Sequence, residues 1–173
     1  MHRSTLPGTA ERQRTASTSD AVLSDGPERT RAIGRAIGEA AAPGTVVALI
    51  GDLGAGKTQL AKGVAEGLGV ASVVNSPTFV LMNEHSGRLR MYHSDAYRLE
   101  DPEDAMAAGL IDERQADGVV VIEWADRIRD WLPADSLEIA MHAPSADADV
   151  RELRWTAVGD AHRRLADAAL RDR

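Results

Sequence analysis

Gly51-Asp-Leu-Gly-Ala-Gly-Lys-Thr58 matches G-x-x-x-x-G-K-[ST], the pattern of the phosphate-binding P-loop. The apolar, β-branched run at 45–50 predicts a buried strand directly before the loop. Behind the loop, apolar residues recur at helical spacing from Leu60 to Leu68, so a helix is expected to open near Lys57. Strand, glycine loop and helix in this order favour nucleotide binding over a chance glycine-rich turn.

The chemistry of phosphate binding explains the residue types in this loop. Glycines permit backbone angles and a close approach that side chains would forbid, so the loop amides can turn inward around phosphate oxygens. The following helix adds the positive end of its dipole. Lys57 is expected to reach the β- and γ-phosphates, and the Thr58 hydroxyl to ligate Mg²⁺. The predicted nucleotide contacts in the loop are Leu53, Gly54, Ala55, Gly56, Lys57 and Thr58.

Composition and charge bound the class of protein. The chain has 173 residues, enough for one domain with a substantial core, and its lack of cysteine excludes disulfides. No apolar run approaches the ~20 residues that span a bilayer, and the N-terminus lacks the apolar segment of an export signal. We therefore expect a cytoplasmic protein with no membrane segment. The formal net charge of −7 disfavours direct RNA binding by the isolated chain.

The order of expected elements predicts a single α/β domain with a P-loop NTPase-like central mixed β-sheet flanked by helices. Residues 1–24 are rich in Ser, Thr and Arg and poor in large apolar residues, so we predict a disordered N-terminal tail, with the domain at 25–173. A helix is expected to start at Pro27 and to end before Pro43. Further strands are predicted at 78–82, 89–95, 118–122, 137–141 and 153–158, and a last helix at 159–170.

An acidic residue follows the buried strand predicted at 118–122. P-loop enzymes place a carboxylate at the end of a second buried strand, where it holds Mg²⁺ directly or through water. Glu123 occupies this position, and Asp126 is a weaker candidate. The alternative is an ordinary solvated acid at the end of a strand. The P-loop favours the metal role for Glu123.

Two further positions are candidates for ATP hydrolysis. Thr78 follows Pro77 between the P-loop helix and the next strand, where switch proteins carry a hydroxyl that senses the γ-phosphate. A simple turn before a strand is at least as good an interpretation of this position. Strand alternation places His93 and Asp95 at the polar end of an apolar face. Asp95 is a candidate for positioning the attacking water or for binding the metal through water, whereas a lone His93 is more typical of a structural histidine.

Together these motifs resemble the TsaE family, small bacterial P-loop ATPases needed for N6-threonylcarbamoyladenosine at position 37 of tRNAs. The match extends over roughly residues 26 to 160, and the tail lies outside it. A single P-loop is generic, whereas the set of motifs is specific. The matching segments are Gly51–Thr58, Ser76-Pro-Thr-Phe79, His93-Ser-Asp-Ala-Tyr-Arg-Leu99, Gly109-Leu-Ile-Asp112 and Val121-Ile-Glu-Trp124.

The resemblance implies ATP and Mg²⁺ as ligands, with Glu123 as a metal ligand and with Asp95 and Thr78 tied to hydrolysis. It also implies an adenine contact in the stretch from Pro27 to Thr30 and a nucleotide contact from Arg151. As partners it implies TsaB and TsaD, with tRNA handled by them and met only indirectly by this chain.

Two other functions are compatible with the same loop. In one, ATP occupancy alone docks a non-catalytic binding module on its partners. In the other, the chain is a small-molecule kinase, although the arginines at 88, 90 and 98 form no convincing lid.

Overall fold

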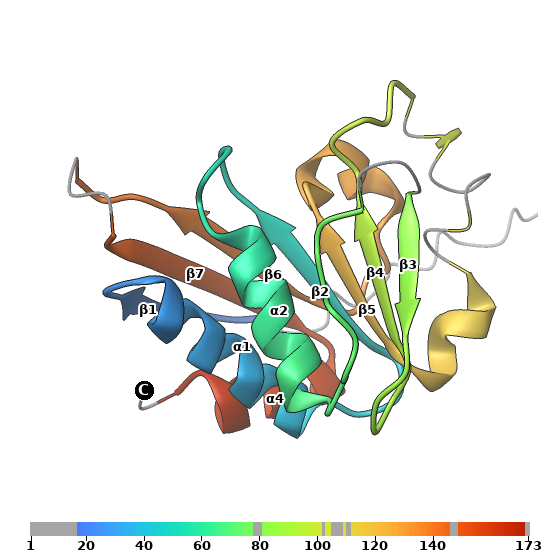
Figure 1. The fold of residues 1–173 in the computed structure, drawn as a ribbon, viewed down its shortest axis with the longest axis horizontal. Coiled ribbons are helices and arrows are strands. Elements are labelled where there is room, and N and C mark those ends of the chain that lie inside the picture. Colours follow the sequence, from blue (N-terminus) through green and yellow to red (C-terminus); the bar gives the residue numbers. More distant parts are fainter. Residues whose placement is uncertain are drawn as a thin grey trace, which may run out of the picture.

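In a computed structural model, the described part of the chain forms one seven-stranded sheet with strand order β1-β7-β6-β2-β5-β4-β3 (Figure 1). The structure describes residues 17–77, 81–101, 103–104, 109, 112–145 and 149–171. The strands are β1 (Ser17–Ser24), β2 (Thr45–Ile50), β3 (Met82–His85), β4 (Met91–Asp95), β5 (Val119–Glu123), β6 (Ser136–His142) and β7 (Arg151–Val158). The helices are α1 (Pro27–Ala40), α2 (Lys57–Gly67) and α4 (Asp160–Ala169), with 3₁₀ turns η1 (Glu113–Asp117) and η2 (Ala125–Trp131).

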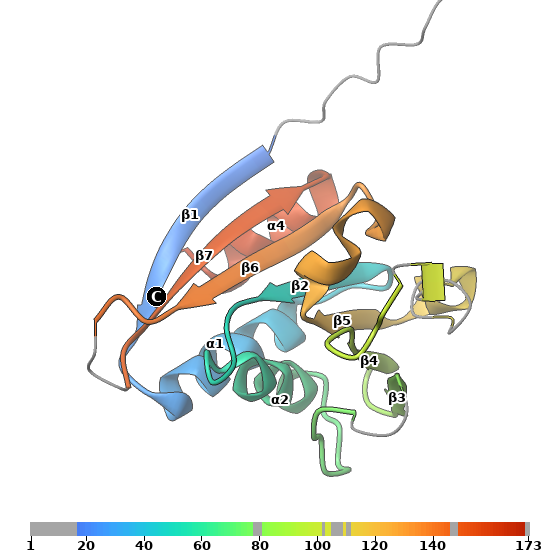
Figure 2. The same cartoon turned by 90° about the horizontal axis from the view of Figure 1, so that it is seen from above.

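Four parallel strands form the centre of the sheet. β2 pairs in parallel with both β5 and β6, and β4 pairs in parallel with β5. The outer strands are antiparallel: β3 pairs with β4, β7 pairs with β6, and β1 pairs with β7. The sheet is therefore mixed, as predicted. Because β2, β4, β5 and β6 point the same way, the segments that follow them gather at one carboxyl edge, seen from above in Figure 2. Ligands of open α/β sheets bind at such an edge.

Apolar residues on the two faces of the sheet form two cores. The larger core packs α1, α2 and α4 against one face, and residues such as Val47, Val121 and Trp155 point into it. The smaller core holds Val46, Val120 and Ile122 on the other face, beneath η2. β2 and β5 are therefore buried on both faces, which explains their unbroken apolar sequences.

Helices α1 and α2 lie side by side on one face, and glycines let their backbones meet (Figures 1 and 2). A Cβ at Gly34 would collide with the Leu60 carbonyl, and one at Gly63 would collide with the Arg31 carbonyl. Gly38 and Gly67 repeat this arrangement one turn further along the two helices. The close contact fixes the start of α1 beside the P-loop helix.

The predicted tail is wrong over residues 17–24, because these residues form strand β1. β1 pairs along its full length with β7, from Ser17 opposite Val158 to Ser24 opposite Arg151. Within the described residues β1 pairs with β7 alone, and of its own residues Val22 and Ser24 are buried. Its sequence therefore lacks the apolar content of an interior strand. Residues 1–16 lie outside the described residues.

Most other predicted elements are confirmed within one or two residues. β3 and β4 form the hairpin expected around Ser86-Gly87. The strand predicted at 78–82 falls largely on residues that the structure does not describe, and β3 begins at Met82. Within the described residues, no helix is both long enough and apolar enough to cross a membrane.

Candidate active site

The P-loop runs from the end of β2 into α2, as its sequence predicts. Gly54 and Gly56 have φ of 80° and 101°, in the left-handed region that favours glycine. At Gly51 a Cβ would lie 2.5 Å from the Met141 carbonyl oxygen of β6, so the neighbouring strand also excludes a side chain there. Leu53 is 85% exposed at the tip of the loop.

The Lys57 side chain folds back over the loop. Its Nζ donates hydrogen bonds to the carbonyl oxygens of Gly51, at 2.5 Å, and Asp52, at 2.9 Å. The same Nζ lies 3.9 Å from the centroid of the Trp124 ring, a cation–π contact. Burial lowers the pKa of Lys57, and nearby carboxylates, led by Glu123, oppose this shift. The ammonium group is thus held at the loop with acids close by.

Trp124 has a left-handed backbone conformation and contacts a second aromatic ring. Among the described residues it is the only non-glycine with positive φ, at 57°. This backbone turn directly after β5 directs its ring towards Lys57 on one side and towards Tyr97, at 4.7 Å between ring centroids, on the other. Arg127 lies 5.0 Å from the centre of the Tyr97 ring. The rings of Tyr97 and Trp124 therefore lie between the exposed Arg127 and the P-loop lysine.

Glu123 is buried at the end of β5, with 2% of its surface exposed. The Thr58 hydroxyl donates to its carboxylate, 2.9 Å from Oε2 and 3.2 Å from Oε1. His93 Nε2 lies 2.8 Å from Oε1, and the His93 side chain is fully buried. The two residues predicted to hold Mg²⁺ are therefore in direct contact, although they are 65 positions apart in sequence.

The chemistry of this pair fits Mg²⁺. The ion prefers oxygen ligands and is commonly held by one or two protein oxygens together with substrate phosphates and water. Thr58 and Glu123 supply a hydroxyl and a carboxylate beside a loop suited to phosphate. Over the described parts of the chain, no three His, Cys, Asp or Glu side chains gather as a closed metal site. The pair fits an ion shared with a phosphate.

Asp95 lies next to Glu123 in the parallel register of β4 and β5. Both of its oxygens are engaged: Ser76 Oγ donates to Oδ2 at 2.5 Å, and the Tyr97 backbone N–H donates to Oδ1 at 2.8 Å. Asp95 thus ties the segment after α2 to the turn after β4, at the edge of the site. Thr78, the other residue predicted for hydrolysis, lies outside the described residues.

The remaining predicted nucleotide contacts meet in one cavity of about 140 Å³. Its lining joins the start of α1, the P-loop and the start of β7. Arg151 donates to the Gly54 carbonyl at 3.2 Å, and the buried Thr30 hydroxyl lies 2.8 Å from Ser24 Oγ. The described lining residues are Gly26, Pro27, Thr30, Gly54, Ala55, Gly56, Gln59, Asp149 and Arg151.

Sequence reasoning missed Gln59, Asp149 and the supporting Ser24. Gln59 stands one position after the P-loop motif, where helical geometry turns its side chain towards α1 and the cavity. The place of Gln59 in the helix could therefore have predicted that it lines the cavity. Asp149 and Ser24 belong to segments that only the β1–β7 pairing brings here, so the sequence held no local sign of them.

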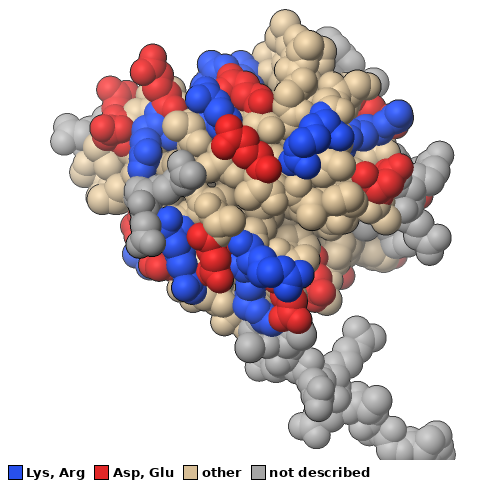
Figure 3. Space-filling model, turned by 90° about the horizontal axis from the view of Figure 1, so that it is seen from below, with Lys and Arg blue, Asp and Glu red and all other residues tan. Residues whose placement is uncertain are grey.

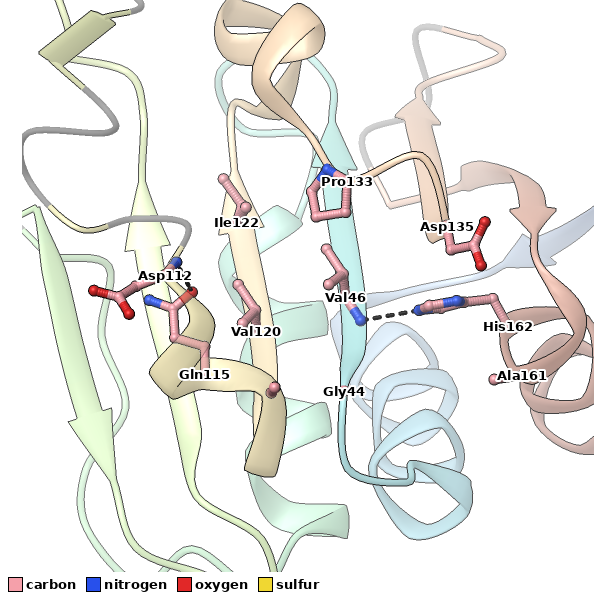
Figure 4. A pocket seen from close by; sticks show the side chains of 11 residues that line it. Gly44, Val46, Asp112, Gln115, Val120, Ile122, Pro133, Asp135, Ala161 and His162 are labelled. Carbon is pink, nitrogen blue, oxygen red and sulfur yellow. Dashed lines mark hydrogen bonds between the residues drawn. The ribbon is translucent and has the colours of Figure 1, made fainter. Parts of the chain in front are cut away.

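A larger cavity of about 380 Å³ lies on the other face of the sheet, away from the P-loop (Figure 4). Val46, Val120 and Ile122 form its apolar wall, and His162 of α4 lies at its margin. The Val46 backbone N–H donates to His162 Nε2 at 3.0 Å. This bond ties the last helix to the strand that leads into the P-loop.

A central parallel strand that runs through a glycine loop into a helix, with a buried acid ending the neighbouring strand, defines the P-loop class of nucleotide-binding folds. Within this class the chain belongs to the TsaE family: the family model described as threonylcarbamoyl adenosine biosynthesis protein TsaE matches residues 24–153. The resemblance drawn from the sequence motifs is confirmed. The chain is thus a member of a family that acts in tRNA threonylcarbamoyladenosine biosynthesis.

Curated relatives of the same description support the assignment. The tRNA threonylcarbamoyladenosine biosynthesis protein TsaE of Bacillus subtilis is 44% identical over 142 residues, covering 82% of this chain and 87% of the relative. The protein of that name from Mycobacterium leprae is 40% identical over 146 residues, covering 79% and 90%. The crystal structure of Bacillus subtilis YdiB superimposes with a TM-score of 0.71 at 36% identity, covering 88% of this chain and 94% of that one.

Proposed function

We propose that the chain is an Mg²⁺-dependent ATPase that supports threonylcarbamoyladenosine formation at position 37 of tRNAs. The observation that carries the proposal is the buried contact between Thr58 of the P-loop helix and Glu123 of β5. A buried carboxylate is costly unless it is hydrogen-bonded or binds a cation, so its place beside a phosphate-binding loop supports a catalytic metal site.

The chain's own residues divide the work of hydrolysis. The P-loop amides and the N-terminus of α2 stabilise negative charge on the phosphates. Lys57 leaves the carbonyls of Gly51 and Asp52 to contact the β- and γ-phosphates, a move its flexible stem allows. Thr58 and Glu123 would hold Mg²⁺, which would supply positive charge beside the transferred phosphoryl group. Asp95, fixed by Ser76 and Tyr97, orients the attacking water, with Thr78 as a candidate second contact.

The cavity between α1, the P-loop and β7 accommodates one end of the nucleotide. Its volume of about 140 Å³ suits a base rather than a whole nucleotide. Pro27 offers an apolar ring edge and Thr30 a hydroxyl, while Arg151 supplies a cation beside Gly54. We assign the adenine to this cavity and the phosphates to the loop.

The proposed partners are TsaB and TsaD, which would handle the tRNA. On the face seen in Figure 3, lysines and arginines are interspersed with acids rather than gathered into a continuous basic area. Together with the net charge of −7, this favours protein partners over direct tRNA binding. We place the reaction in the cytoplasm, where ATP, Mg²⁺ and tRNA meet.

Phosphate release from ATP by the purified chain, with and without purified TsaB and TsaD, tests the proposal. We expect slow hydrolysis alone, a strong rise with the partners, and no release when Mg²⁺ is chelated. The Glu123→Ala variant is expected to release no phosphate in either condition. Hydrolysis unchanged by Glu123→Ala would remove the metal role from this residue. If the chain did not bind TsaB and TsaD, and if adding them did not change its rate of hydrolysis, the partner-dependent part of the proposal would be overturned.

A further inference from the structure

His93 is buried beside the proposed metal site, but the roles assigned above leave it unused. It lies in the middle of β4, its side chain has no exposed surface, and its Nε2 lies 2.8 Å from Glu123 Oε1. Its other ring nitrogen, Nδ1, is buried and has no hydrogen-bond partner among the described residues. The ring therefore makes its one polar contact with the carboxylate.

The hydrogen bond has a defined direction. A carboxylate oxygen can only accept, so His93 must carry a proton on Nε2 and donate it. In the neutral ring the proton stays on Nε2, which leaves Nδ1 as a bare lone pair. An unpaired buried N–H would be more costly, so the surroundings of Nδ1 favour the same tautomer.

The two side chains that donate to Glu123, Thr58 and His93, differ in whether metal binding requires them to break their hydrogen bonds. The Thr58 hydroxyl is itself a proposed metal ligand, so its bond to Glu123 must rearrange when the ion binds. His93 is held between buried strands and is not a proposed ligand. Of the two side chains that donate to Glu123 among the described residues, only His93 can keep its bond throughout. Residues that hold a metal ligand in this way affect metal affinity strongly.

We propose that His93 is the positioning residue for Glu123: its Nε2–H holds Oε1 and leaves Oε2 facing Thr58 and the ion. This inference rests on the proposed function, since it assigns Glu123 to the metal. It does not place His93 in contact with ATP or with the metal.

Binding of Mn²⁺, a spectroscopic substitute for Mg²⁺, to the full chain saturated with ADP tests the inference without relying on activity. Free Mn²⁺ is followed by electron paramagnetic resonance. We expect His93→Leu, which fills the space without a donor, to weaken Mn²⁺ binding about 10- to 100-fold. His93→Gln carries an amide N–H near the place of Nε2 and is expected to stay within about threefold of wild type. ADP affinity without metal should be the same in all three proteins.

Two controls separate positioning from folding. His93→Asn keeps a polar side chain but is too short to reach Glu123, so it should bind Mn²⁺ as weakly as His93→Leu; it also replaces His93→Leu if that variant fails to fold. Equal Mn²⁺ affinity in wild type and His93→Asn would overturn the inference, as would a Gln variant as weak as the Asn variant. Wild type that binds neither ADP nor Mn²⁺ would instead overturn the proposed function itself.

Discussion

Two buried histidines lie in opposite regions of the sheet and use the same ring nitrogen in opposite ways. His93, near the carboxyl edge, donates from Nε2 to the Glu123 carboxylate. His162, beside the cavity on the other face, accepts at Nε2 from the Val46 backbone N–H (Figure 4). In both rings Nδ1 is buried without a hydrogen-bond partner among the described residues.

The partner, rather than burial, sets the role of each ring. A histidine that holds a side-chain carboxylate controls the direction of a group that can act on a ligand. A histidine that caps a backbone N–H satisfies a group that would otherwise be buried and unpaired. Substitutions near His93, at the carboxyl edge, should therefore reduce activity but not stability. Substitution of His162 should reduce stability but not activity.

The largest effect is expected at the P-loop lysine. Lys57→Ala removes the cation that we propose contacts the phosphates, so we expect phosphate release to fall about 100- to 1,000-fold. The melting temperature should change little, because the Lys57 ammonium hydrogen-bonds two carbonyls of its own loop and its contact with the Trp124 ring is worth about 0.5–1 kcal/mol. Lys62→Ala, on the same helix, is the matched control and should retain activity. If Lys57→Ala lost stability as well as activity, the distinction between the two regions would be contradicted.

Replacing the second histidine should give the reverse result. His162→Leu leaves the Val46 N–H buried and unpaired, at a cost of about 1–3 kcal/mol in the free energy of unfolding. Urea denaturation measures this loss, and phosphate release per folded molecule should stay at the wild-type level. His142→Leu, at a half-exposed position where only a solvent-accessible contact with Glu152 is lost, serves as control and should change stability by less than about 1 kcal/mol. An unaltered urea midpoint in His162→Leu would contradict the assigned role.

Acidification should also weaken the contribution of His162, which accepts from the Val46 N–H, but the loss of stability should be smaller. Burial lowers the pKa of His162 below its usual value, and an exposed charge on Asp135 opposes this only in part. The unfolded chain takes up a proton near pH 6.5 while the folded chain resists it. Stability therefore declines as the pH falls below about 6.5 and levels off below the folded pKa. This one group contributes at most about 1.4 kcal/mol per pH unit.

Urea midpoints measured between pH 5 and 8 test this slope. His85 also has its pKa lowered by burial and adds to the wild-type decline. The His162→Leu protein should therefore show a shallower decline rather than none. Parallel pH profiles for the two proteins would assign the whole effect to other groups.

The sequence was sufficient to predict the parts of the molecule that are local in the chain. The P-loop, its strand and its helix lie within about two dozen residues, and the contact between Thr58 and Glu123 follows from the rule that parallel strands end at one edge. The family resemblance, outside its motifs, added Pro27, Thr30 and Arg151, which the structure brings together in one cavity.

The features that the sequence did not predict depend on long-range pairing. β1 is polar because it has one partner strand and little burial, so its composition resembles a tail, and its partner lies more than 120 residues away. The glycines between α1 and α2 look like ordinary breaks in helical patterns until the two backbones are seen to touch. The bond from Val46 to His162 spans 116 positions and leaves no pattern in either segment.

A crystal structure with Mn²⁺ and a slowly hydrolysed ATP analogue tests the central claim, that Thr58 and Glu123 form the metal site, most directly. Anomalous scattering from Mn²⁺ locates the ion. The account predicts an ion bound to Thr58 Oγ1 at about 2.1 Å, with Glu123 as a ligand or one water away and still bonded to His93. An ion held elsewhere, with Thr58 still donating to Glu123, would contradict it.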